Sequence, residues 1–222
     1  MNATVAATRV LVRPLANPLS LGFVGLFFAT TLLTGIQLGW VPLSATHMLA
    51  IAMLAFTVPA QSIACIYGFL TRDSVAATGL GILSGTWASL ALVTLLSPPG
   101  GHSAALGLLL ATAAAAVCMP ALGAAPAKRL AAAVMFGTAA RWVVTAVYEF
   151  TGSPGWEVAA GAVGLALGVL ALYATLAFEI EDQNRRTVLP TFRRGAGEVA
   201  MLGGLQEQVA NAANEAGVRT QL

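Results

Sequence analysis

The sequence VAATGLGILSGTWASLALVTLLS, residues 75–97, contains no charged side chain and ends at the turn formed by residues 98–101, PPGG. At 1.5 Å per residue, a helix of this length covers the ~30 Å hydrocarbon core of a bilayer. Similar stretches fill the chain from Pro14 to Phe178, where only seven charged residues occur, almost all at regularly spaced breaks. With 58% hydrophobic and 9% charged residues and a mean hydropathy of +0.81, the composition excludes an ordinary soluble domain.

The apolar stretches predict the fold class: an all-α, polytopic membrane protein with six transmembrane helices. Asn17-Pro18 is expected to begin the first helix as its N-cap and first residue. The short loops make consecutive helices antiparallel neighbours. We divide the chain into an N-terminal segment (1–16), a transmembrane domain (17–179) and a C-terminal tail (180–222). The expected spans are about 18–40, 47–70, 75–97, 103–122, 128–150 and 156–178.

Basic residues lie on one side of the predicted spans. They precede the first span, lie in alternate loops and follow the sixth span, whereas the other loops contain no Lys or Arg. By the positive-inside rule, both termini are expected on the cytoplasmic side. The expected location is the plasma or inner membrane. The basic residues outside the spans are Arg9, Arg13, Arg72, Lys128, Arg129, Arg185, Arg186, Arg193, Arg194 and Arg219.

The tail differs in composition from the spans. Residues 191–197 form a basic turn, which we expect to lie along the anionic headgroups of the inner leaflet. Apolar residues from Glu198 to about Glu215 recur at helical spacing and predict a short amphipathic helix. This helix could pack under the membrane domain, join subunits, bind a partner or stay mobile.

Small residues in two spans predict close helix packing. The pairs Gly81/Gly85 and Gly164/Gly168 form small-x-x-x-small faces, which let helix backbones approach each other. Such faces suit packing within one protomer and contacts between subunits equally well.

Polar residues inside the spans have two interpretations. Pro59, beside Thr57 and Gln61, predicts a kink in the second span, either around a buried polar cluster or along a water-filled path. For the polar side chains of the first span there are two hypotheses: they bond their own backbone, or at least some of them line a pore. The first-span residues concerned are Thr30, Thr31, Thr34 and Gln37.

Motifs for enzymatic or metal chemistry are not expected in this chain. Ser84 lies in a Gly-x-x-Ser-Gly stretch, but no span offers a histidine to activate it, so we predict that the protein is not an enzyme. Cys65 and Cys118 are isolated within apolar stretches, and we expect no metal and no cofactor. The chain carries no basic stripe with stacking aromatics, so nucleic acid is not an expected partner.

Arg141 is the one charge in the middle of a span. It shares a helix face with Thr138, Thr145 and Glu149, because these residues are spaced at i, i+3, i+7 and i+11. A charged stripe of this kind should face the protein interior rather than lipid. Two hypotheses follow: Arg141 lines a pore as an anion ligand, or it forms a buried ion pair with Glu149 or Glu157 of a neighbouring helix or subunit.

Two local motifs resemble the acetate uptake transporter family, also called succinate–acetate permeases. The segment ANPLSLGF, residues 16–23, resembles the family's Asn-Pro-Ala-Pro-Leu-Gly-Leu signature, and residues 186–190, RTVLP, resemble its closing motif. Ala60-Gln61 and Trp87 also lie where family members carry Ala-Gln and Trp. The resemblance covers roughly Leu15 to Pro190.

The resemblance implies a six-helix protomer with its own central pore, assembled as a ring-shaped homo-hexamer. The implied substrates are small monocarboxylates such as acetate, with succinate as a second candidate, moved passively or with a proton. Membrane lipid is the other expected partner. The alternative is a non-transporting scaffold or accessory subunit with the same fold, and conduction of ammonium or another small solute is a third hypothesis.

The resemblance also implies residues of the substrate path. Asn17 and Pro18 correspond to the family's turn at the pore mouth. The family's constriction of two aromatics and one Leu corresponds to Leu26, Leu83 and Thr138, so all three positions depart from the pattern. The complete predicted path comprises Asn17, Pro18, Leu26, Gln61, Leu83, Thr138, Arg141 and Thr145.

Overall fold

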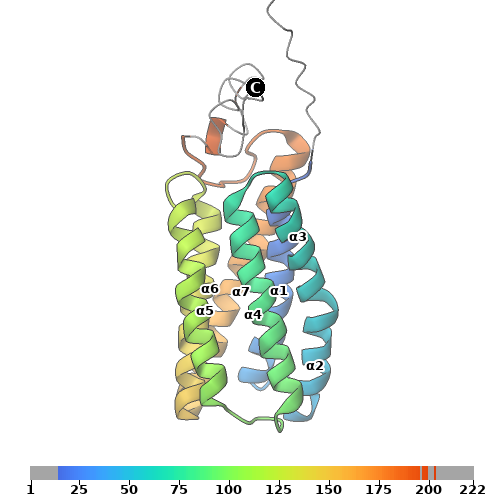
Figure 1. The fold of residues 1–222 in the computed structure, drawn as a ribbon, viewed down its shortest axis with the longest axis vertical. Helices are drawn as coiled ribbons and strands as arrows, with labels where there is room; N and C mark the ends of the chain where they lie inside the picture. The colour runs from blue at the N-terminus through green and yellow to red at the C-terminus, as the bar shows by residue number, and fades with distance from the viewer. Residues whose placement is uncertain (1–14, 196, 200–202, 204–222) are drawn as a thin grey trace, which may run out of the picture.

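The structure, a computed structural model, describes residues 15–195, 197–199 and 203, all of them in or next to one helical bundle (Figure 1). Six of its helical stretches are long and apolar enough to cross a membrane. The elements in chain order are α1 (Pro18–Gln37), η1 (Leu43–Ala45), α2 (Thr46–Ala52), the π-helical turn η2 (Met53–Thr57), α3 (Val58–Leu70), α4 (Ser74–Leu96), α5 (Ala104–Ala124), α6 (Arg129–Thr151) and α7 (Pro154–Asn184).

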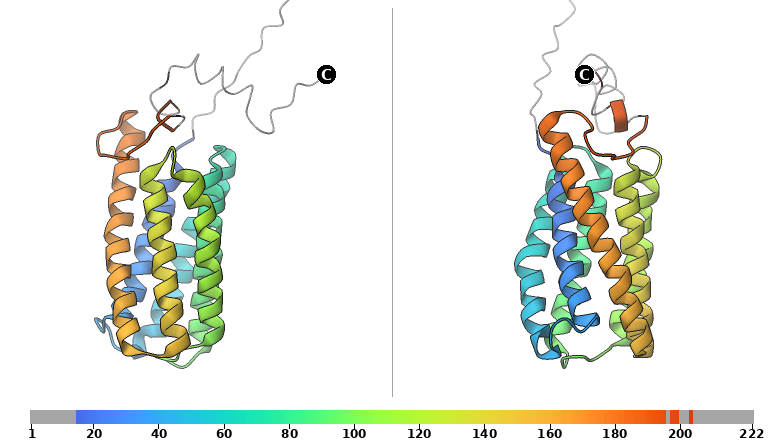
Figure 2. Two further views of the ribbon diagram at one scale, coloured as in Figure 1. Left: turned by 90° about the vertical axis from the view of Figure 1, so that its left-hand side faces the viewer. Right: turned by 180° about the vertical axis from the view of Figure 1, so that it is seen from behind.

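The six spans form a closed ring. Each contacts the span before it and the span after it in the chain, and α1 and α7 close the circle by packing on each other. The views in Figure 2 show the helices running side by side along the long axis, as short antiparallel connections require. The prediction of an all-α membrane protein with six spans is therefore confirmed.

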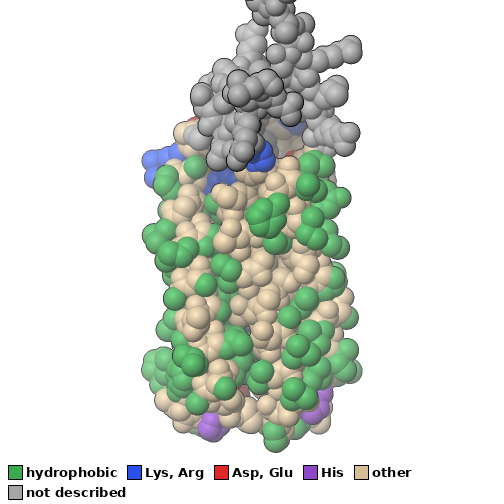
Figure 3. All heavy atoms as spheres, viewed as in Figure 1, with side chains coloured by type: hydrophobic (Ala, Val, Ile, Leu, Met, Phe, Trp, Pro, Cys, Tyr) green, Lys and Arg blue, Asp and Glu red, His purple; other side chains and the backbone are tan. Residues whose placement is uncertain are grey.

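Apolar side chains cover the sides of the bundle, whereas charge gathers at its ends. Figure 3 shows hydrophobic side chains along the flank, Lys and Arg at one end and His at the other. We call the first the basic end, where Asn17, Arg72 and Lys128 lie, and the other the vestibule end, where Gly101 and Gly152 lie. An apolar flank suits contact with lipid chains, which offer no hydrogen bonds.

Local sequence sets the helix ends. Asn17 caps α1, with its Oδ1 accepting a hydrogen bond from the Leu19 N–H at 3.0 Å, and Pro18 follows at the first helical position, as predicted. Asp73 caps α4 in the same way through the Ala76 N–H at 3.2 Å. Gly152 ends α6 with a φ of 61°, a left-handed conformation that glycine adopts without strain.

The predicted kink at Pro59 takes the form of the π-helical turn η2. Proline has no N–H to donate and its ring crowds the carbonyl four residues earlier, so a wider turn before it relieves the clash. Thr57 donates to the Gly25 carbonyl at 3.2 Å, and Gln61 donates to the Gly22 carbonyl at 3.3 Å. Both side chains are fully buried, so the turn carries a buried polar cluster that binds the second span to α1.

The sixth span continues beyond its apolar stretch. We expected the tail to begin at residue 180, but α7 remains helical to Asn184 and ends at Arg185, which has a φ of 50°. The apolar stretch therefore ends before the helix does. The helix expected from Glu198 to Glu215 lies almost wholly outside the described residues.

The two glycine pairs differ in what they face: one packs within the protomer, and the other lies partly on its outer surface. Gly164 and Gly168 lie against threonines of α1, so this pair serves packing within the protomer. On α4, Gly81 faces Cys65 of α3, whereas Gly85 has open space around it.

The close contact at Gly68 yields a prediction about stability. A Cβ built there would lie 2.5 Å from the backbone N and 2.8 Å from the Cα of Ala77 on α4. Because backbone cannot move aside cheaply, Gly68→Ala should lower the free energy of unfolding by ~1–3 kcal/mol. Thermal unfolding in detergent measures the change. Gly123→Ala on the exposed face of α5 is the matched control and should be neutral or stabilising, and equal stability of the two variants would contradict the packing of α3 on α4.

Candidate functional site

The three residues predicted at the constriction lie inside the ring. Leu26 of α1, Leu83 of α4 and Thr138 of α6 are all fully buried, and the two leucines belong to one hydrophobic core. The Thr138 hydroxyl donates to the Val134 carbonyl of its own helix at 2.9 Å. Its polarity is thereby satisfied locally.

Two tryptophans lie one helical turn from these residues, toward the vestibule end. Trp87 follows Leu83 by four residues on α4, and Trp142 follows Thr138 by four residues on α6. The rings are fully buried and meet edge to face, with centroids 6.4 Å apart. Neither indole N–H has a hydrogen-bond partner. Trp142 therefore places aromatic bulk beside Trp87, one turn away from the expected constriction.

Trp142 was not predicted as a site residue, although the sequence contains a signal for it. Tryptophan in membrane proteins is enriched at the interfaces with water. Trp87 and Trp142 instead lie near the middle of their spans. A mid-span tryptophan is an indication of an interior role that hydropathy does not report.

A cavity of about 70 Å³ opens at the vestibule end. Every span contributes to its wall, so the cavity lies on the axis of the ring. Its lining includes Gln37 of α1, Met53 of the second span, Leu90 of α4, Leu106 of α5, Glu149 of α6 and Glu157 of α7.

The polar lining of this cavity is acidic. Glu149 accepts a hydrogen bond from the Ser103 N–H at 2.8 Å, next to the start of α5. The Tyr148 hydroxyl of α6 lies beside the Glu157 carboxylate of α7. These contacts orient both carboxylates at the cavity wall, where a helix N-terminus favours negative charge.

The polar stripe of α6 faces the interior, as predicted. Thr138 and Arg141 are fully buried, and Thr145 and Glu149 are nearly so. The Thr145 hydroxyl donates to the Arg141 carbonyl at 2.8 Å. The stripe leads from the cavity wall at Glu149 toward the middle of the bundle.

Arg141 does not form the predicted ion pair. In the described part of the chain, the ion pairs of arginine and lysine involve other residues, and Arg141 Nη1 donates to the Ala160 carbonyl of α7. Arg141 Nε and Nη2 have no hydrogen-bond partner. Complete burial within one protomer also keeps a carboxylate of another subunit out of reach. An arginine at the centre of a span costs about 2.5–3.5 kcal/mol on insertion scales, so its presence needs a reason.

Thr30 and Thr34 of α1 do not bond their own helix, which was one of the two interpretations of the sequence. Thr30 and Thr34 donate to the Gly164 and Gly161 carbonyls of α7, at 3.4 and 3.5 Å, instead of bonding their own helix. Gln37 lines the cavity. The polar face of α1 therefore joins α1 to α7 and reaches the cavity at one end.

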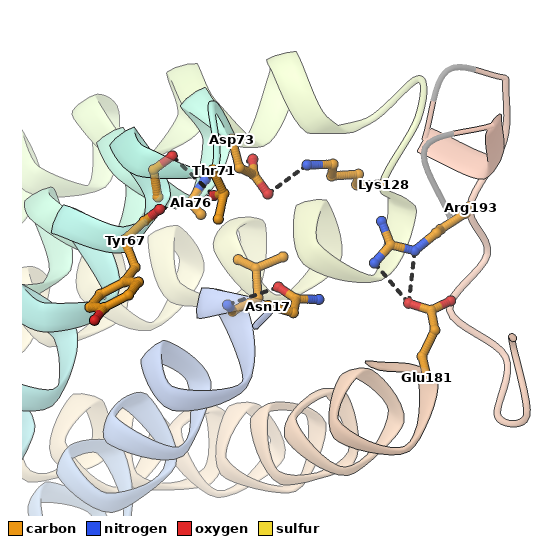
Figure 4. A network of polar contacts seen from close by, with 10 residues as sticks. Asn17, Tyr67, Thr71, Asp73, Ala76, Lys128, Glu181 and Arg193 are labelled. Atoms are coloured by element: carbon orange, nitrogen blue, oxygen red, sulfur yellow. Dashed lines mark hydrogen bonds and ion pairs between the residues drawn. The ribbon is translucent and has the colours of Figure 1, made fainter. Parts of the chain in front are cut away.

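Two ion pairs lie at the basic end, where α1 begins (Figure 4). Lys128 Nζ is 2.6 Å from Asp73 Oδ2, which connects the α5–α6 turn to the start of α4. Arg193 Nη2 is 2.7 Å from Glu181 Oε2. Asn17 lies at this end of the bundle, and Pro18 follows it as the first residue of α1; these two residues are the predicted mouth of the path.

The closing motif is held by a buried carboxylate. Glu181 is fully buried and accepts hydrogen bonds from the hydroxyls of Thr187 and Thr191, both at 2.9 Å, and from Arg193 Nε at 2.8 Å. The Arg194 N–H donates to the Ala127 carbonyl of the α5–α6 turn at 3.0 Å. The expected basic turn along the headgroups is therefore wrong for Thr191 and Arg193, because Glu181 draws both back onto the bundle.

Comparisons with known proteins agree with this architecture. The structure of the bacterial acetate channel SatP superposes with a TM-score of 0.72 at 22% identity, over 80% of this chain and 99% of that chain. No curated protein matches the sequence. The sequence model of the GPR1/FUN34/yaaH family matches residues 1–193, and the chain belongs to this family.

Proposed function

We propose that the protein is a channel or permease for small carboxylate anions, with the monocarboxylate acetate as the first candidate and the dicarboxylate succinate as the second. The observation that carries the proposal is a ring of six spans around an axial cavity and a narrow interior, in the fold of the acetate channel SatP. Family membership supports the same function. Transport is favoured over the scaffold alternative because the interior holds buried polar groups that plain packing does not need.

The proposed path runs along the ring axis. From the cavity at Glu149 it follows the α6 stripe past Thr145 and Arg141 to the constriction, and it leaves near Asn17 and Pro18. Gln61 is a candidate path residue because its buried Oε1 has no hydrogen-bond partner. Leu26, Leu83, Trp87 and Trp142 are all fully buried, so side chains must move before an anion can pass. The substrate gradient, alone or coupled to a proton, would drive transport of the anion.

Flux through the constriction is the first test. Labelled acetate should enter proteoliposomes faster than protein-free liposomes. In a background free of Cys65 and Cys118, reaction of Leu83→Cys with a small thiol reagent should abolish most of this uptake, because the adduct refills and blocks the constriction. The exposed Leu92→Cys on the same helix is the matched control. Uptake equal to that of empty liposomes would refute transport, and full uptake after complete modification of residue 83 would refute the path.

We also propose that both termini are cytoplasmic, so the basic end faces the cytoplasm of a plasma or inner membrane. The asymmetry of Lys and Arg supports this orientation. In the same cysteine-free background, an impermeant maleimide added to intact cells should label Ser153→Cys but not Gly123→Cys. Gly123 is exposed with open space around it, so its cysteine should react once cells are opened. Labelling of residue 123 in intact cells would contradict this orientation.

We propose in addition that the protomers assemble as a homo-hexamer. Its support is the family resemblance and a groove on the flank between α4 and α5, whose small residues permit close helix contact. Gly85, Ser89 and Thr112 are among the lining residues. Mass measurement in mild detergent should give six copies, and Gly85→Leu should shift the population toward smaller species. A wild-type protein that is monomeric at all concentrations would overturn the assembly.

A further inference from the structure

Arg141 carries a buried charge that no side chain in the described part of the protomer neutralises. A guanidinium stays ionised in proteins, and burial of an ion is costly unless a counter-charge accompanies it. Arg141 is fully buried, its one hydrogen bond goes to a neutral carbonyl, and no carboxylate in the described residues pairs with it. The interior therefore presents a cation that fits an anion from outside the chain.

We propose that Arg141 is an anion-binding residue that holds the carboxylate of a small monocarboxylate on its Nε–Nη2 edge. The proposal rests on the proposed function and names the residue that selects the charged form of the substrate. Nε and Nη2 are the two atoms without hydrogen-bond partners, and they lie on one edge of the guanidinium plane. Two parallel N–H donors of this kind match a carboxylate.

The same chain uses this arginine edge for a carboxylate elsewhere. Arg193 directs its Nε and Nη2 at Glu181 Oε2, at 2.8 and 2.7 Å (Figure 4). Arg141 offers the same pair of donors, and among the residues that the structure describes no side chain fills the role of Glu181. A carboxylate that is free to arrive and leave would take that role.

The residue that packs on the Arg141 guanidinium is a glycine, and a larger side chain would collide with it. A Cβ at Gly164 of α7 would lie 2.6 Å from Arg141 Cζ, 2.8 Å from its Nε and 2.3 Å from Thr34 Oγ1, so only glycine leaves room for this arrangement. The Thr34 hydroxyl bonds the Gly161 carbonyl at a long 3.5 Å, and it can turn to a ligand at little loss.

The position of Arg141 suits a selective step in the path. It lies ~12 Å inward of Glu149 along α6 and ~4.5 Å before Thr138, at 1.5 Å per residue. Gln37, which lines the cavity, lies against Gly161, about one turn of α7 from Gly164. An anion from the cavity would therefore reach Arg141 before the constriction. A single guanidinium in an enclosed site favours one negative charge, and hence a monocarboxylate.

Thermal unfolding of the full-length protein in detergent tests the site without transport. Acetate should raise the unfolding temperature of the wild type, whereas acetamide, which has the same shape without the charge, should not. Arg141→Met should remove the acetate shift and unfold at a higher temperature than the wild type in acetate-free buffer, because it removes the unpaired charge. Arg129→Met, an exposed position on the same helix, is the control and should keep the shift.

The outcomes separate the site from the permease function. Persistence of the acetate shift in Arg141→Met, or an equal shift with acetamide or with chloride, would overturn the proposal. If Arg141→Met does not fold, Arg141→Lys decides: loss of the two-donor edge should weaken acetate binding about tenfold, and unchanged affinity refutes the site. Acetate binding at Arg141 without flux in liposomes would refute the permease function alone. Flux together with unaltered acetate binding in the Arg141 variants would refute the site alone.

Discussion

The ring depends on hydrogen bonds that bare glycine backbones accept from neighbouring spans. Thr57 and Gln61 of the second span donate to Gly25 and Gly22 of α1. Thr30 and Thr34 of α1 donate in turn to Gly164 and Gly161 of α7. All four acceptors are glycine carbonyls, because only a residue without a side chain lets a partner approach this closely. In hydrocarbon, where apolar surface gives little preference for one neighbour over another, these contacts place α1 between α3 and α7 and so close the circle.

Hydropathy and capping residues were enough to predict the spans, and helical periodicity was enough to predict that the α6 stripe faces inward. Both signals are local, since they need only the chain within a few turns. The π-helical turn and the partners of Thr30 and Thr34 depend on which spans become neighbours, which hydropathy does not encode. Glu181 was missed for a different reason: it follows the end of the apolar stretch, where charge is ordinary, and its burial results from the chain folding back over it.

Aromatic side chains fill the interior one helical turn from the expected constriction. Leu26 and Leu83 occupy positions where the family pattern has aromatic residues, which by itself indicates a wider interior. Trp87, which the family pattern also carries, packs edge to face on Trp142, with ring centroids 6.4 Å apart. Trp142 lies four residues after Thr138 on α6, so it faces the same interior. Trp142 therefore adds aromatic volume beside Trp87, one turn from the positions where this chain has leucine.

Along the axis, negative charge lies at the mouth of the cavity and positive charge lies deeper, which is the reverse of an arrangement that would attract anions from solution. Carboxylates of Glu149 and Glu157 line the cavity at the mouth, and the only cation on the α6 stripe lies deeper, at Arg141. Acidic groups at the mouth lower the local concentration of anions, and this effect weakens within a Debye length of ~10 Å at 0.1 M salt. A buried guanidinium acts differently, because water does not screen it and its donors have a fixed direction. If Arg141 acts as proposed, capture of a carboxylate depends on the loss of its hydration at Arg141 rather than on attraction from the bulk solution, and selection takes place inside the ring instead of at its entrance.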